Sequence, residues 1–132
     1  MSNVRRHMPC TVIFQGAEIS VDSIEAFGQR LDEFDTTAQF ELWLHAAEGP
    51  RVCMLRNERD AWLLYLRHEG DSGYTTSGDP RRTDFVSYHL SNQQVDEYPG
   101  EWCIPVEDCY KGLASFFVNN GAQPEWISWK KS

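Results

Sequence analysis

The chain has 132 residues, of which 41% are hydrophobic and 13% aromatic, so it can fill the core of one domain but not of two ordinary ones. Its 20 acidic residues outnumber 12 lysines and arginines, and the net charge of −8 disfavours nucleic acid as a ligand and favours a basic protein. No segment is apolar enough to cross a bilayer or serve as a signal peptide, so we expect a cytoplasmic chain with no membrane partner.

The first third of the chain predicts an arm, a strand and a helix. Residues 1–9 are polar and aperiodic, and we expect a loose arm there before a single domain at 10–132. Cys10–Phe14 is typical of a strand. Asp22 is expected to cap a helix, with Glu25 in the capping-box position. The apolar stripe of this helix consists of Ile24, Phe27, Leu31 and Phe34.

Three strand-like segments follow, at residues 39–45, 51–56 and 61–67. The short polar connections between them favour an antiparallel meander. The third segment is apolar on both faces, so we expect it to lie centrally in a sheet with a helix on one side. Residues 68–82 are rich in Gly, Ser, Thr and Asp and predict a long loop.

The remainder of the chain predicts further strands around a second helix. Residues 84–90 alternate as a strand does, and 92–101 are polar and acidic with one weak strand near Gln94 and Val95. Pro105 suits the first turn of a helix, Gly121 suits its end, and the segment 126–129 has strand chemistry. The helical stripe is Val106, Tyr110, Leu113 and Phe117. The predicted fold is α+β, with one mostly antiparallel sheet and two helices packed on it.

A search for reactive groups predicts no catalytic, metal or cofactor site. The histidines are scattered, and the cysteines form no C-x-x-C pair, so we expect free thiols that pack as small hydrophobes. Cys109 falls in the first turn of the second helix, where the dipole favours a thiolate, but Glu107 and Asp108 oppose this. A small enzyme that uses Cys109 or His89 remains a third interpretation of the chain.

One charge pattern stands out between Thr83 and Tyr110, which contains no Lys or Arg. Its acidic residues are Asp84, Asp96, Glu97, Glu101, Glu107 and Asp108. This pattern is typical of the solvated surface of an acidic protein, and equally of a recognition surface whose carboxylates steer a cationic partner.

The recognition hypothesis places partner-binding residues in two segments, 96–102 and 69–79. Aromatic side chains presented on the turn Tyr98-Pro99-Gly100 would anchor the partner beside these carboxylates. The nine candidate residues are Glu69, Asp71, Tyr74, Asp79, Asp96, Glu97, Tyr98, Glu101 and Trp102.

The C-terminal unit resembles the Imm1 family of bacterial immunity proteins. The resemblance rests on Ile104-Pro105, Phe116-Phe117, Asn120-Gly121, Pro124 and Ile127-Ser128-Trp129, and the segments 62–66 and 73–78 are also similar to that family. It implies a protein without catalytic residues that protects its producer by binding a toxin domain in the cytoplasm. Several family members are paired with nucleic-acid deaminase toxins, which are zinc enzymes that act on cytosine.

Charge and resemblance point to the same hypothesis. A toxin that grips nucleic acid presents a basic cleft, and an acidic protein can occlude that cleft by imitating phosphate charge. We therefore expect an immunity protein that neutralises a deaminase toxin in this way. The alternative is a cytoplasmic adaptor or regulatory module that binds another protein, and the identity of the neighbouring gene separates the two.

Overall fold

The computed structural model describes residues 10–132, and the predicted N-terminal arm at 1–9 lies outside the described residues. The strands are β1 (Thr11–Phe14), β2 (Ala17–Ile19), β3 (Gln39–His45), β4 (Arg51–Asn57), β5 (Asp60–Leu66), β6 (Tyr74–Thr76), β7 (Phe85–His89), β8 (Val95–Pro99) and β9 (Trp129–Lys131). The helices are α1 (Ile24–Phe34), α2 (Val106–Val118) and a 3-10 turn, η1 (Gly100–Trp102).

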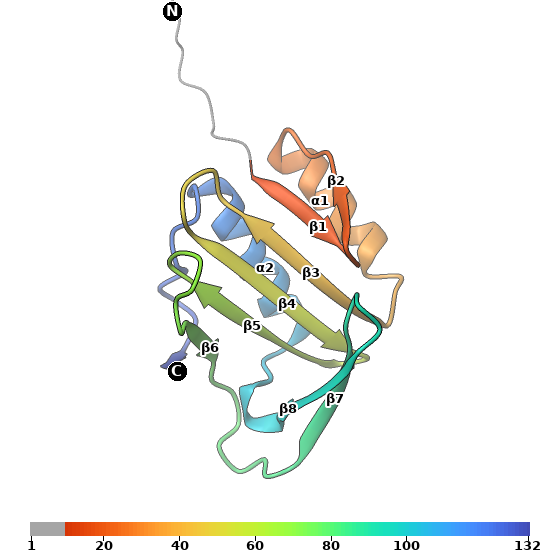
Figure 1. Cartoon of the computed structure of the whole chain (residues 1–132), viewed down its shortest axis with the longest axis vertical. Helices are drawn as coiled ribbons and strands as arrows, with labels where there is room; N and C mark the ends of the chain where they lie inside the picture. The colour runs from red at the N-terminus through yellow and green to blue at the C-terminus, as the bar shows by residue number, and fades with distance from the viewer. Residues whose placement is uncertain (1–9) are drawn as a thin grey trace, which may run out of the picture.

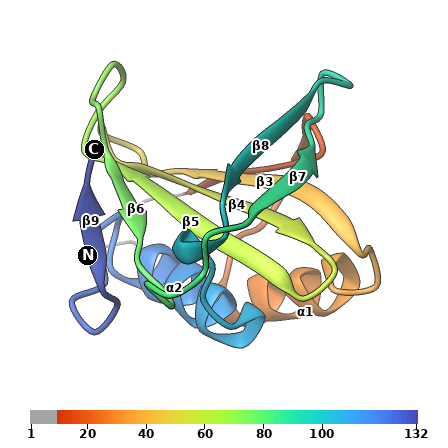
Figure 2. The same cartoon turned by 90° about the horizontal axis from the view of Figure 1, so that it is seen from below.

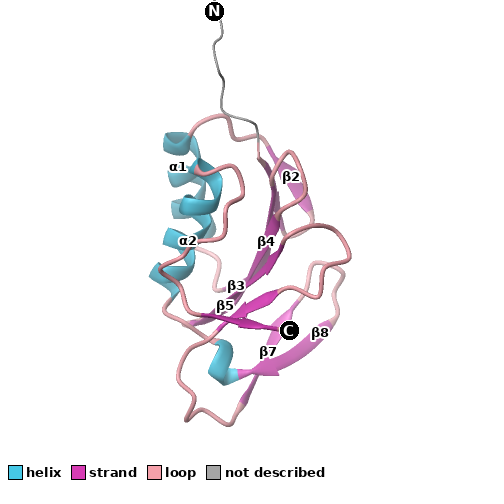
Figure 3. Cartoon of the chain, turned by 90° about the vertical axis from the view of Figure 1, so that its left-hand side faces the viewer, coloured by secondary structure: helices cyan, strands magenta, loops and turns pink. Residues whose placement is uncertain are grey.

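Three layers make up the molecule. The central layer is an antiparallel sheet of seven strands in the order β2-β1-β3-β4-β5-β6-β9, and both helices pack on one of its faces (Figure 1). A separate hairpin, β7–β8, rises from the opposite face, where β7 contacts β3 and β4 (Figures 2 and 3). The predicted α+β fold is confirmed, and the small second sheet is an addition to it. No helix among the described residues is long and apolar enough to cross a membrane.

The three central strands form the predicted meander. Leu42, Met54 and Leu63 lie in matching register on β3, β4 and β5, and all three are fully buried beneath the helices. The middle strands are apolar on both faces because the hairpin covers part of the other side. The central position predicted for the third segment is confirmed, with α2 against one face of β5.

Helix α1 begins one residue later than predicted. The cap is Ser23, whose Oγ accepts a hydrogen bond from the Ala26 amide at 3.0 Å, whereas Asp22 makes no cap. Both residue types suit this role, and the extended backbone of Ser23 places its hydroxyl over the first turn. Phe27 is fully buried and stacks on Phe117 of α2 with a centroid distance of 4.7 Å, which joins the helices over the sheet.

Helix α2 follows Pro105, which is its cap and lies just outside the first turn. Leu113 and Phe117 of the predicted stripe are buried, which confirms half of it, whereas Val106 and Tyr110 are partly buried and the other buried side chains are Cys109 and Phe116. Gly121 has a φ of +92° and its amide donates to the Phe116 carbonyl at 2.9 Å, so the predicted helix end is confirmed.

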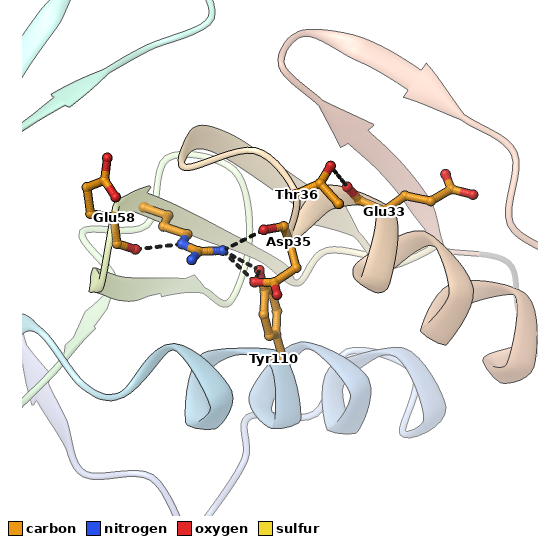
Figure 4. A network of polar contacts seen from close by, with 6 residues as sticks. Glu33, Asp35, Thr36, Glu58 and Tyr110 are labelled. Carbon is orange, nitrogen blue, oxygen red and sulfur yellow. Dashed lines mark hydrogen bonds and ion pairs between the residues drawn. The ribbon is translucent and has the colours of Figure 1, made fainter.

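A polar cluster centred on Arg56 of β4 fastens the ends of both helices to the sheet (Figure 4). The Arg56 guanidinium pairs with the Asp35 carboxylate and donates to the Tyr110 hydroxyl at 3.0 Å, and its Nε donates to the Glu58 carbonyl at 2.6 Å. Tyr110 in turn donates to Asp35 at 2.8 Å. Tyr110 and Arg56 together lower the pKa of Asp35.

The sheet edges differ from the prediction. The expected strand at 126–129 is displaced to β9, because residues 124–128 form a turn closed by a hydrogen bond from Trp129 Nε1 to the Pro124 carbonyl at 2.8 Å. β6 interrupts the predicted loop at 68–82, and β2 was not predicted. In the described part of the chain, the main sheet therefore ends in a three-residue strand on each side.

Candidate functional site

The hairpin β7–β8 covers one half of the second face of the main sheet. Val86 and Tyr88 point inward and pack with Cys53, Leu55 and Trp62. Polar contacts hold the hairpin at the middle of β7 and at the turn that follows it. Asn57 Nδ2 donates to the Ser87 carbonyl at 2.8 Å, and the amide and hydroxyl of Ser91 donate to Glu41 at 2.9 and 2.7 Å. The hairpin is thus held in one orientation.

Tyr98 and Trp102 lie at the edge of this contact and are less exposed than the predicted anchoring role assumes; the role itself stays a prediction. Both are half-buried, and each ring lies 4.9 Å from the ring of Trp62. Trp62 projects from the second face of β5 and needs a cover, and these two rings supply it. The predicted turn at Tyr98-Pro99-Gly100 is instead the junction of β8 with η1, and the buried Gly100 donates to the Asp84 carbonyl at 2.8 Å.

Two of the predicted partner-binding carboxylates are occupied within the chain. Asp71 receives two hydrogen bonds from the Arg67 guanidinium, at 2.9 and 2.8 Å, and one from its backbone amide. Asp79 receives hydrogen bonds from Arg81 in the same way. The arginine lowers the pKa of the carboxyl group in each pair. Each charge is therefore compensated by an arginine close in sequence, and the predicted partner-binding role of both residues stays a prediction.

The carboxylates of the acidic run differ in their partners: Asp84 pairs with Arg82 at 2.6 Å, whereas those farther along the hairpin have no cation beside them in the described part of the chain. Within the described residues, neither Glu97 nor Glu101 belongs to an ion pair. Glu97 is exposed and accepts a hydrogen bond from the Ser87 hydroxyl at 3.3 Å, and Glu101 is partly exposed. Asp96 is half-buried and accepts hydrogen bonds from Tyr98 and Gln94 at 3.2 and 3.4 Å. We call β7, β8 and η1 together the acidic hairpin.

The structure brings only part of the two predicted segments together. The Gly78 amide donates to the Glu101 carbonyl at 2.6 Å, and Thr76 Oγ1 donates to the Trp102 carbonyl at 2.8 Å, so the end of the first segment lies beside η1. Glu69 and Asp71 lie past the other end of β5, which is roughly 20 Å long at the usual rise per residue. Tyr74 is half-buried beneath Arg67, whose guanidinium carbon lies 5.6 Å from the ring centre.

The uncovered half of the second face contains a shallow groove that the sequence did not predict. Its volume is about 320 Å³, and Glu69 stands on its rim. Its lining consists of Ile13, Trp43, His45, Arg51, Leu66, Glu69 and Gly70. Burial lowers the pKa of His45. The one available signal was Trp43, which falls on the face of its strand opposite to the buried leucines. The groove carries charges of both signs, unlike the acidic hairpin.

Reactive groups are not gathered in the described part of the chain. No three side chains of His, Cys, Asp or Glu are placed there to hold a metal ion. The thiol of Cys109 is fully buried, and desolvation raises its pKa well above the ordinary value. The thiol is therefore not suited to the nucleophilic role considered in the third interpretation. His89 is exposed at the end of β7.

Thiol labelling tests this description of the cysteines. In the native protein at neutral pH we expect Cys103, which is half-buried, to react first, and Cys10, Cys53 and Cys109 to react only on unfolding. Burial raises the pKa of Cys10 to about 12 and raises those of Cys53 and Cys109, so thiolate is scarce at each. Mass spectrometry after a short pulse of iodoacetamide gives the order of labelling. Rapid native labelling of Cys109 would return the thiol-enzyme interpretation to consideration.

Comparison with known proteins adds no relatives. No protein-family model matches the chain. No curated protein matches it either. The geometry and charge of the acidic hairpin therefore carry the functional proposal.

Proposed function

We propose that this chain is a cytoplasmic immunity protein. It binds a cognate bacterial toxin domain, a nucleic-acid deaminase, and neutralises it by occluding the basic active-site cleft. The observation that carries the proposal is the acidic hairpin. A stretch of 28 residues without Lys or Arg, Thr83–Tyr110, contains this rigid projection. Asp84 at its base pairs with Arg82, whereas Glu97 and Glu101 of the hairpin belong to no ion pair in the described part of the chain.

Charge supplies the first part of the mechanism. A deaminase that holds single-stranded nucleic acid needs cations along its cleft to meet the phosphates. The carboxylates of Glu97 and Glu101 attract the same cations, which accelerates encounter and orients the two proteins. Each carboxylate that replaces a phosphate also competes directly with substrate.

Rigidity supplies the second part. The hairpin is fixed by the rings of Trp62, Tyr98 and Trp102 and by the hydrogen bonds to Asn57 and Glu41. A surface that is ordered before binding loses less conformational entropy when it docks. The hairpin projects away from the helices, so a partner can close over it without displacing the core (Figure 2).

The resemblance to immunity proteins supports the proposal from a different part of the molecule. The residues that carry it lie mainly in α2 and the following turn, where Phe116, Phe117 and Ile127 are buried. These residues stabilise the fold, so they leave the choice of target to a surface elsewhere. The acidic hairpin lies on the opposite side of the main sheet (Figure 3).

The test uses the toxin domain encoded beside this gene, purified and assayed on a single-stranded cytosine substrate. We expect the chain to form a stable complex with it, to inhibit deamination in a saturable way, and to restore growth of cells that express the domain. A complex that leaves deamination unchanged would contradict occlusion and favour the adaptor alternative. Absence of such a neighbouring domain, or absence of binding, would refute the proposal.

A further inference from the structure

The outward face of the β7–β8 hairpin exposes two large apolar side chains. Phe85 is 64% exposed and Val95 is 51% exposed. The pairing register places Phe85 opposite Pro99, Ser87 opposite Glu97, and His89 opposite Val95. Phe85 and Val95 therefore occupy diagonal corners of one face, with the carboxylate of Glu97 between them. In an antiparallel pair whose other face is packed, polar residues are expected at such positions.

We infer that this outward face is the anchoring part of the partner interface. The inference rests on the proposed function and specifies the chemistry of the partner. The toxin domain presents apolar side chains to Phe85 and Val95, and a lysine or arginine to Glu97. Apolar side chains that become dry on binding contribute most of the energy of an interface, and the surrounding polar groups set its orientation.

The charge of the face decides which occupant fits. A second copy of this chain, related by two-fold symmetry, would place Glu97 and its neighbours against the same residues. Like charges in contact oppose such a dimer, because no Lys or Arg lies between Thr83 and Tyr110. Nucleic acid is opposed by the same negative charge. A basic protein surface satisfies both the carboxylate and the apolar corners.

The packed inward face of the β7–β8 hairpin fixes the position of its outward face. Val86, Tyr88 and Tyr98 alternate with the exposed residues and are packed against the main sheet. The strands that carry Phe85 and Val95 are thus fixed before the partner arrives, which reduces the entropy lost on binding.

The experiment compares two double variants with the wild-type chain against the same purified neighbouring toxin domain. The first is Phe85→Ser with Val95→Ser. The matched control is Ile24→Ser with Val118→Ser, since these side chains are 37% and 45% exposed and belong to the helices on the other side of the sheet. Each double variant removes apolar side chains that are exposed rather than part of the core. Both variants should therefore keep the circular dichroism spectrum and the midpoint of unfolding of the wild-type chain.

The hairpin double variant is expected to lose affinity by about 100-fold, mainly through faster dissociation, while the control stays within about threefold of the wild type. The single variant Phe85→Gln, which keeps a long side chain, should bind the toxin domain with about tenfold lower affinity. It replaces the double variant in the experiment if the double variant is unstable. Wild-type affinity in the hairpin variants would overturn this inference and leave the proposed function standing. Failure of the wild-type chain to bind would overturn both. A wild-type dimer in sedimentation that the hairpin variant abolishes would assign the face to a second copy instead.

Discussion

Reversing the charges of Glu97 and Glu101 together to lysine is expected to slow association with the toxin domain by at least about tenfold at low ionic strength. Both carboxylates belong to the acidic hairpin, and neither is in an ion pair within the described residues. Asp96 is left unchanged because its carboxylate accepts hydrogen bonds from Tyr98 and Gln94, so its replacement would disturb the hairpin itself.

The control for this charge reversal is Glu18→Lys with Glu125→Lys. It changes the net charge by the same amount at β2 and in the turn before β9, away from the hairpin. Stopped-flow fluorescence gives the association rate at two salt concentrations. The difference between the two variants should shrink as the screening length falls from about 10 Å at 0.1 M salt to about 3 Å at 1 M. Equal rates at low salt would mean that net charge alone attracts the partner, and would remove the hairpin from the mechanism.

Gly78→Ala is expected to destabilise the fold by about 2–4 kcal/mol and to weaken binding of the toxin domain. A Cβ atom at this position would lie 1.8 Å from the Cys103 carbonyl oxygen and 3.1 Å from that of Glu101. Both are backbone atoms, so η1 would have to move away from the strand that carries Thr76. The hydrogen bonds from Gly78 to Glu101 and from Thr76 to Trp102 would then be lost, and the rings over Trp62 with them.

Urea unfolding measures this change, and Gly28→Ala is the matched control. Nothing lies within 4 Å of a Cβ built on Gly28, which is inside α1, so alanine there should raise stability by about 0.5–1 kcal/mol through its higher helix propensity. An unchanged urea midpoint for Gly78→Ala would show that η1 tolerates displacement, and that the acidic hairpin is not held as tightly as described.

The parts of the fold that sequence could predict are those in which local pattern and burial agree. β3 alternates strictly, with Phe40, Leu42 and Leu44 buried on one face, and its connections to the next strands are short. Both helices carry apolar residues at helical spacing. The turn after α2 was predictable because Gly121 adopts a positive φ that other residues disfavour.

The short edge strands could not be predicted, because three residues carry no periodicity and each strand forms only when its neighbour is in place. The half-buried positions of Tyr98 and Trp102 could not be predicted for a related reason. Tyr98 and Trp102 look exposed in a polar acidic segment, and only the position of Trp62 on the second face of β5 shows that they are covers for it. Likewise, Asp71 looks like a free charge until the loop brings Arg67 around it.

The acidic run could be recognised from the sequence alone, because the absence of Lys and Arg between Thr83 and Tyr110 can be read without knowing the fold. Its arrangement was not visible. The expected weak strand near Gln94 and Val95 is in fact the five-residue β8, and only its pairing with β7 sorts the residues into an inward and an outward face. Phe85 and Val95 are therefore not among the candidate residues predicted from the sequence, because the sequence shows that they are apolar but not that they face outward.

The three-residue strands at the two edges of the main sheet affect how much of this protein a cell can store. A further chain that paired with β2 or β9 would gain only a few hydrogen bonds, and at β9 it would meet Lys130 and Lys131. Short strands at the edges of a sheet offer few hydrogen bonds to an added chain, so they do not favour fibril growth. We therefore expect the chain to stay free of aggregates even when it accumulates to a high concentration.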